Sequence, residues 1–177
     1  MAYLLDKDGY QLHDVAGFVL ADADSFALIT DRTAADVQYV LTLASKGLNM
    51  TADEWNQWLL GLKGAYNYMD FNRVEKAVEY VVERLQTVGW FLCPSTKTDW
   101  TVSDFPTVSE MQRYLDNIRL LRSALPVGLP QAPGDMDKLT YTEANTIEQI
   151  LSMLDAAVTN IMKNVFYSNE IFSGEVQ

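Results

Sequence analysis

The sequence predicts a mainly α-helical protein: a bundle of three long and two shorter helices, with a small N-terminal β-hairpin and an extended C-terminal tail. The pattern Thr-x-x-Glu occurs at Thr51, Thr107 and Thr140, each time before an amphipathic stretch. In such a capping box the two side chains satisfy backbone N–H groups at the start of a helix. All five prolines fall in two linkers, residues 89–106 and 126–139. Because proline interrupts a helix interior, these linkers divide the last three helices into separate rods.

Residues 1–29 are expected to form an attachment segment built on the β-hairpin. Two short runs that each begin with tyrosine, residues 3–5 and 10–12, flank Asp8-Gly9, and Asp-Gly is typical of a two-residue hairpin turn. A lone hairpin is only marginally stable in water. We therefore expect this segment to pack on the helical bundle or on a partner.

The helical domain is predicted to span residues 30–166, and its first two helices are the shorter ones. Asp31 or Thr33 is expected to cap the first helix, which runs to about Ser45. The second helix follows Thr51 and is broken by glycines at 61 and 64. The expected apolar positions are Val37, Val40, Leu41 and Ala44 in the first helix, and Trp55, Trp58, Leu59 and Leu62 in the second.

The third helix is expected to begin at Asp70, as its N-cap, and to stop at Gly89. The fourth is expected to begin after Thr107 and to end at Pro126. The fifth should begin at Thr140 or Thr142 and run for about 27 residues, or about 40 Å at 1.5 Å per residue. The apolar stripe of the third helix comprises Phe71, Val74, Val78, Val81, Val82 and Leu85.

Charged residues on the third helix lead to two expectations. Glu75, Glu79 and Glu83 are expected on its solvent side, close to Lys76 and Arg84, as an ion-paired surface. Arg73 lies in the first turn, where the helix dipole slightly disfavours a cation. We therefore expect Arg73 to pair with an acid across the bundle, either Asp99 or Asp104.

Residues 167–177 are predicted to form the extended tail. The unit aromatic-Ser-x-Glu-aliphatic occurs there twice in succession, beginning at Tyr167 and at Phe172. An odd period places the two aromatic residues on opposite faces of an extended strand. Both are therefore candidate partner contacts, and the tail is interpreted as a pairing or docking surface.

Composition excludes several classes of partner. The 177-residue chain carries 24 acidic and 13 basic side chains, a net charge of −11, which repels nucleic acid and anionic lipid. Its longest apolar runs fall short of the ~20 residues that cross a membrane. The N-terminus lacks the basic and apolar regions of a signal peptide, so synthesis in a cytosol-like compartment is expected.

The sequence offers little for catalysis, and no cofactor or metal is expected. His13 is the single histidine and Cys93 the single cysteine, which excludes the usual zinc ligand sets. His13 is interpreted as a loop residue, and Cys93 as a small apolar filler. A pair of carboxylates like that of a glycosidase stays open, because acidic residues are plentiful.

Aromatic residues are the candidate contacts with a partner or ligand. Trp90 and Trp100 flank the first linker, where packing on the bundle is favoured over stacking on sugar rings. Tyr66, Tyr68 and Phe71 belong to a glycine-containing corner before the third helix. They are core residues if the corner packs inward, and a partner surface if it faces outward.

Several blocks of the chain resemble a protein family from phages and prophages of Firmicutes. The blocks are residues 29–40, 62–81, 96–125, 138–151 and 167–176, for example LKGAYNYMDFNRVEKAVEYV at 62–81. The family is usually encountered in tail and baseplate regions. The resemblance implies a non-enzymatic virion structural protein that is assembled in the bacterial cytoplasm. Other tail or baseplate proteins are its implied partners, and no catalytic motif carries over.

Two further functions and one further partner stay open. A carbohydrate-binding module would recognise a host-surface glycan through Trp90, Trp100 and tyrosines. A cell-wall hydrolase would use a carboxylate pair. The long apolar-striped fifth helix and the expected edge strands also make a homo-oligomer a candidate assembly.

Overall fold

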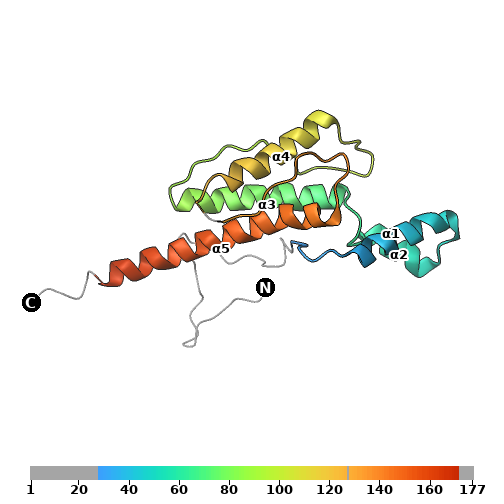
Figure 1. The fold of residues 1–177 in the computed structure, drawn as a ribbon, viewed down its shortest axis with the longest axis horizontal. Helices are drawn as coiled ribbons and strands as arrows, with labels where there is room; N and C mark the ends of the chain where they lie inside the picture. Colours follow the sequence, from blue (N-terminus) through green and yellow to red (C-terminus); the bar gives the residue numbers. More distant parts are fainter. Residues whose placement is uncertain (1–27, 127, 172–177) are drawn as a thin grey trace, which may run out of the picture.

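The computed structural model describes residues 28–126 and 128–171, with side chains as far as residue 164. Five α-helices occur in this part of the chain, and no strand does (Figure 1). This confirms the prediction of a mainly helical protein with three long and two shorter helices. The long helices have 20, 15 and 31 residues, and the shorter ones have 13 and 9. The hairpin predicted at residues 3–12 lies outside the described residues. The helices are α1 Ala34–Lys46, α2 Ala52–Leu60, α3 Tyr68–Thr87, α4 Val108–Arg122 and α5 Tyr141–Ile171.

Threonine capping boxes begin α1, α2 and α4. The boxes predicted at Thr51 and Thr107 are both formed, and Thr33 with Asp36 makes another before α1. At α5 the Thr140 N–H donates to Glu143, while the Glu143 N–H donates to the Thr140 hydroxyl. Of the two expected caps, Thr140 is therefore the one that forms these bonds. A 3₁₀ turn, Gly47–Asn49, joins α1 to the residues before α2.

The prediction that Asp70 caps α3 is wrong. Asn67 is the N-cap, and its side chain accepts from the Met69 N–H. Asp70 stands three positions later, where one carboxylate oxygen accepts from the Asn67 N–H. The helix therefore begins a turn earlier than predicted, and this frees the other oxygen of Asp70 for arginine.

The core lies between α3, α4 and α5, which contact one another pairwise (Figure 1). The apolar stripe predicted for α3 is confirmed, because all six of its residues are buried. The two linkers also contribute to the core, through Trp100 from the first and Leu129 from the second. From α4 and α5 the fully buried core side chains, apart from the charged Glu148, are Tyr114, Leu115, Ile118, Leu121, Ile147, Ile150, Leu151, Leu154 and Val158.

Helices α1 and α2 form an arm, residues 34–60, that extends from one end of the bundle (Figure 1). The arm buries a single side chain, Leu43. The predicted apolar face of α1 is covered only in part: Val37 and Val40 are half-buried, whereas Leu41 and Ala44 are exposed. Helix α2 is joined to α1 by the Tyr39 hydroxyl, which donates to Gln57 at 2.7 Å.

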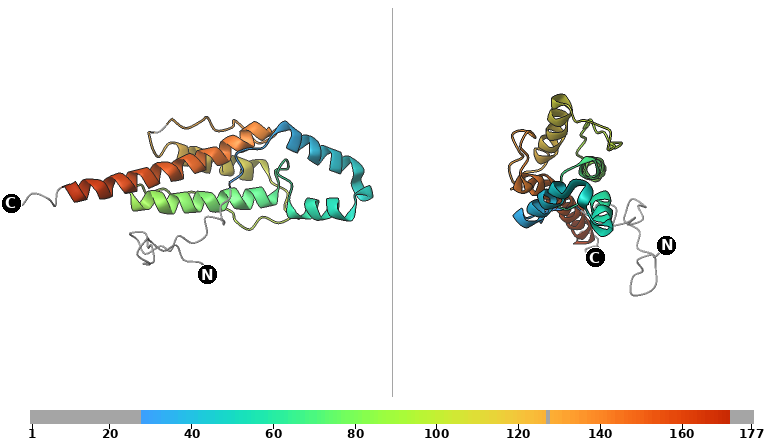
Figure 2. Two further views of the ribbon diagram at one scale, coloured as in Figure 1. Left: turned by 90° about the horizontal axis from the view of Figure 1, so that it is seen from below. Right: turned by 90° about the vertical axis from the view of Figure 1, so that its right-hand side faces the viewer.

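Helix α5 extends past the other end of the bundle, opposite the arm (Figure 2). Its 31 residues end at Ile171, so the prediction of an extended tail from residue 167 is wrong for residues 167–171. The Tyr167 position belongs to α5, while Phe172 lies outside the described residues.

Candidate docking surfaces

The aromatic corner before α3 packs inward. The Phe71 ring lies 5.4 Å from that of Tyr66, 5.6 Å from that of Tyr114 and 5.3 Å from that of Trp100, measured between centroids. Phe71 and Trp100 are buried. Tyr66 and Tyr68 are half-buried and pack against the same core. Three predicted contact residues, Tyr66, Phe71 and Trp100, are thus brought together as an aromatic cluster of the core.

Two tyrosine hydroxyls meet inside this cluster. The oxygens of Tyr66 and Tyr114 lie 2.5 Å apart and share a hydrogen bond. Burial raises the pKa of both phenols above its ordinary value, because the phenolate is poorly solvated there. Both hydroxyls are therefore neutral at physiological pH, and they bond α4 to the corner.

Trp90 lies apart from the cluster. It follows the end of α3 and exposes 42% of its surface, and the neighbouring Phe91 exposes 79%. The prediction that packing is favoured at both linker tryptophans is therefore confirmed for Trp100 and wrong for Trp90. The chain turns outward after α3 through Gly89, which adopts a φ of 91°. Cys93, predicted to be an apolar filler, is also exposed.

A buried cluster of four charges joins the arm to the bundle. The Arg32 guanidinium lies 2.8 Å from Asp70 and 2.7 Å from Glu148. Arg73 lies 2.5 Å and 2.8 Å from the same two carboxylates. Two positive and two negative charges therefore compensate one another, with Arg73 half-buried and the other three buried, as a buried ion pair requires.

Arg73 does reach an acid across the bundle, but the predicted partners, Asp99 and Asp104, are wrong. Its partner is Glu148 of α5. Burial alone would lower the pKa of Arg73, but the bonds to Glu148 and Asp70 outweigh it and raise the pKa above its ordinary value. Sequence reasoning missed Arg32 and Glu148 altogether. The available signal was Asp70, since a carboxylate three residues before Arg73 makes that turn a natural arginine site.

Arg32 also closes the base of the arm. Its Nε donates to the Lys63 carbonyl at 3.1 Å, and its Nη1 donates to the Ile29 carbonyl at 2.7 Å. The Arg32 N–H and carbonyl bond the side-chain amide of Asn145, each at 2.9 Å. Gly64 approaches Asp36 so closely that a Cβ at residue 64 would lie 2.2 Å from the Asp36 carbonyl. The two ends of the arm are therefore held together against the bundle.

A second buried carboxylate fixes the first linker. Glu75 was expected to face solvent, but its side chain is 1% exposed, and that prediction is wrong. Its oxygens bond both terminal nitrogens of Arg113, at 2.6 and 2.8 Å, and accept from the Lys97 N–H at 2.9 Å. Arg113 on α4 and the linker over α3 enclose Glu75. Glu79 is exposed, as expected.

Both buried sites are built as structural links, because each carboxylate is engaged by an arginine. Among the described residues, no three histidine, cysteine, aspartate or glutamate side chains gather to hold a metal ion. In the same part of the chain, no helix combines the length and apolarity needed to cross a membrane. His13 lies outside it.

Of the thirteen large apolar side chains exposed in the described part of the chain, six lie on the arm. Leu48 at the tip exposes 92% of its surface and Leu60 exposes 81%. Exposed apolar side chains gathered on one element favour an interaction site more than single scattered ones do. We call this the arm surface. It comprises Tyr39, Leu41, Leu48, Trp58, Leu59 and Leu60.

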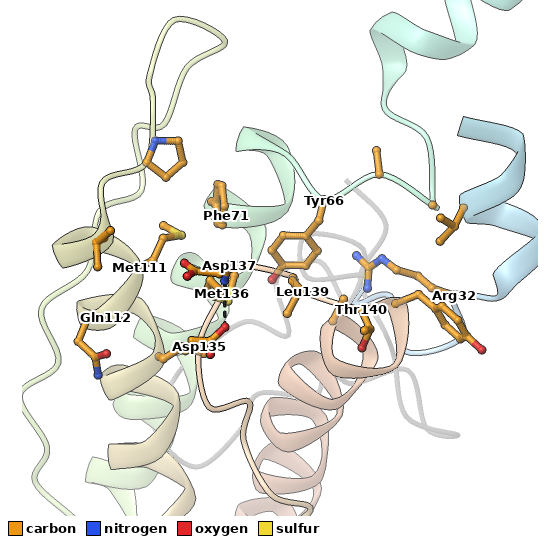
Figure 3. Close-up of a pocket in the computed structure, with 18 residues that line it drawn as sticks. Arg32, Tyr66, Phe71, Met111, Gln112, Asp135, Met136, Asp137, Leu139 and Thr140 are labelled. Atoms are coloured by element: carbon orange, nitrogen blue, oxygen red, sulfur yellow. Dashed lines mark hydrogen bonds between the residues drawn. The ribbon is translucent and has the colours of Figure 1, made fainter. Parts of the chain in front are cut away.

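Two pockets lie beside the base of the arm. One has a volume of about 490 Å³ and runs from Trp58 and Leu59 to the first linker at Val102. The other has a volume of about 750 Å³ and lies between α4, the end of the second linker and the segment at Gly64 (Figure 3). We call the second the α4 pocket. Both are lined mainly by apolar side chains, so this end of the molecule is well suited to protein contact.

No protein-family model, curated protein or solved structure matches the chain.

Proposed function

We propose that the protein is a non-enzymatic structural component of a phage or prophage virion, associated with the tail or baseplate, and that it acts through protein–protein assembly. The arm surface is the observation that carries the assembly role. The tail or baseplate assignment is supported by the resemblance of the sequence blocks at residues 29–40, 62–81 and 96–125.

The arm is poorly stabilised by its own contacts. Helices of 13 and 9 residues are marginal in water unless an apolar face is packed. Here Leu43 is the one side chain that the arm buries, while leucines at 41, 48, 59 and 60 remain exposed. Burial of apolar surface contributes about 25 cal/mol per Å². Binding of a partner to the arm surface would therefore stabilise the arm as well as the complex.

The partners in this proposal are other tail or baseplate proteins, with a second copy of this chain as the alternative. Static light scattering separates these cases, since a monomer has a mass of 20.0 kDa and a homo-oligomer a multiple of it. The net charge of −11 disfavours nucleic acid and anionic membranes as partners. Assembly would take place in the host cytoplasm, with the virion as the final location.

Particle composition tests the proposal. We expect the genes beside the one for this chain to encode tail proteins. We also expect mass spectrometry to detect the protein in purified particles at a fixed ratio to a known tail protein. Its absence from particles that contain their complete tails would overturn the proposal.

Binding to a host-surface glycan is the second candidate function. The observation in its favour is the exposed pair Trp90 and Phe91, because exposed aromatic faces stack on sugar rings. A glycan array with the wild-type protein and a Trp90→Ala variant tests it, and binding should be lost in the variant. The third hypothesis, cell-wall hydrolysis, predicts turnover of purified peptidoglycan, which the structural role does not.

A further inference from the structure

We propose that the α4 pocket receives an apolar anchor side chain of a partner protein, carried next to a lysine or arginine. This inference rests on the proposed assembly role and specifies one partner contact within it. The pocket is separate from the arm surface, so the two can be tested independently.

The size and lining of the pocket suit a single large side chain with its neighbours. Its volume of about 750 Å³ lies within the ~300–1,000 Å³ typical of ligand pockets. Figure 3 shows Phe71, Met111 and Met136 around it, with Leu139 on the side of α5. Methionine side chains adapt to irregular apolar partners. An aromatic or branched aliphatic group would therefore find contacts on several sides.

The mouth of the pocket adds further apolar contact. Val108, at the start of α4, is 82% exposed. Tyr141, the first residue of α5, is more than one-third exposed. Both residues line the pocket. A partner chain would therefore bury apolar surface around the anchor as well as beneath it.

The charged residues of the pocket determine which charge the partner residue beside the anchor should have. The charged residues that line it are Arg32, Asp135 and Asp137. Arg32 is already compensated by Asp70 and Glu148. Asp135 and Asp137 are exposed, and neither forms an ion pair with another described residue.

The rim therefore has two exposed carboxylates, neither in an ion pair with a described residue, beside an apolar interior. Figure 3 places both carboxylates next to Met136, with the Asp137 N–H donating to Asp135 at 3.1 Å. Potentials across an interface tend to be complementary, and like charges placed together are strongly unfavourable. A basic residue beside the anchor would complete the rim, whereas an acidic one would be repelled.

Two synthetic peptides with opposite charges test this directly. The probes are acetyl-Gly-Lys-Phe-Lys-Gly-amide and acetyl-Gly-Glu-Phe-Glu-Gly-amide, titrated into the full chain labelled with ¹³C at its methionine methyls. We expect the basic peptide to shift the Met111 and Met136 signals saturably and to leave Met153, on the exposed side of α5, unchanged. The acidic peptide should bind at least about tenfold more weakly. Replacing phenylalanine by alanine in the basic peptide should abolish the shifts.

Charge variants then assign the preference to the rim. The double variant Asp135→Asn, Asp137→Asn should lose the discrimination between the two peptides. The matched control Asp53→Asn, an exposed acid on α2, should retain it. Far-UV circular dichroism confirms that each variant is folded.

Three outcomes would overturn the inference: equal binding of both peptides, no saturable shift with either, or shifts confined to Met153. Shifts of Met111 and Met136 that depend on protein concentration without peptide would identify a second copy as the occupant and would also overturn it. If the peptide experiment fails but the protein still occurs in purified particles, the proposed function stands. Absence from particles, with peptide binding retained, overturns the proposed function alone.

Discussion

Arg32 and Glu148 lie 116 positions apart in the sequence, yet their side chains form a buried ion pair of 2.7 Å. Glu148 also accepts from the Ile29 N–H at 2.6 Å. One carboxylate of α5 therefore fixes the segment that leads into the arm. Because Arg32 bonds the Lys63 carbonyl as well, the orientation of the whole arm depends on this pair.

Removing Arg32 should unfold the protein much more easily than removing an exposed cation. Arg32→Met leaves Asp70 and Glu148 with Arg73 as their remaining cation, and breaking a buried ion pair costs about 3–5 kcal/mol. Urea denaturation measures this loss. The control Lys46→Met removes an exposed pair with Glu54, and exposed ion pairs contribute little to stability. Similar losses in the two variants would contradict a structural role for the cluster.

A methyl group at Gly64 should displace the arm. The new Cβ would lie 2.2 Å from the Asp36 carbonyl, so the backbone must move, and overpacking of this kind costs about 1–3 kcal/mol. Thermal unfolding of Gly64→Ala measures the effect. Gly134→Ala is the matched control, because nothing lies within 4 Å of its Cβ. Equal melting temperatures for the two variants would show that the arm does not sit closely on residue 64.

Glu75→Gln should loosen the first linker. The substitution leaves Arg113 without its carboxylate and weakens the bond to the Lys97 N–H. We expect a loss of about 1.5–3 kcal/mol, as for hydrogen bonds to charged groups. Hydrogen exchange at the amides of Lys97 and Trp100 should accelerate in this variant. The exposed Glu83→Gln serves as the control, and acceleration of equal size there would rule out the link.

Acid should destabilise the helix starts. Glu110 accepts hydrogen bonds from Thr107, and Glu143 accepts them from Thr140. In each pair the backbone N–H lowers the pKa of the carboxyl most, followed by the hydroxyl, so that both pKa values lie below the ordinary 4.5. A lowered pKa in the folded state stabilises the fold above pH 4.5, and the gain is lost as pH falls through the folded value. The melting temperature should therefore fall below about pH 4.5.

The variant Glu110→Gln, Glu143→Gln isolates this contribution. It cannot titrate at these positions, so its melting temperature should change less with pH between 7 and 3 than that of the wild type. The exposed Glu83→Gln control should follow the wild-type curve. An identical acid dependence in wild type and double variant would exclude the capping boxes as its source.

Helix boundaries and the bundle core could be predicted from the sequence because their signals are local. Capping at Thr51 and Thr107 depends on residues three positions apart, and the stripe of α3 follows from helical periodicity. The start of α3 was misassigned although its signal is local too, since Asn67 and Asp70 form a capping box three positions apart. The ion pair of Asp70 with Arg32, 38 positions away, is a different matter. Short-range patterns contain no information about such a pair.

The buried face of α1 and the burial of Glu75 could not be predicted from the sequence either. Periodicity groups Leu41 with Val37 on one face, but Leu41 is exposed and Leu43 is the buried residue of α1. Glu75 occupies a position that would be exposed on an isolated helix. Arg113 and the linker cover it in the bundle, and neither partner is local in sequence. Of the candidate contacts, the inward packing of Phe71 was one of two alternatives that the sequence left open.

Incorporation of arm variants into particles tests the central claim most directly. Leu41→Lys and Leu60→Lys change side chains that are already exposed, so we expect the melting temperature to stay unchanged, since such surface changes usually stay within about 0.5 kcal/mol. Met153→Lys, an exposed apolar position on α5, is the matched control. The account predicts that both arm variants are depleted from purified particles while Met153→Lys is incorporated like the wild type. Normal incorporation of the arm variants would contradict it.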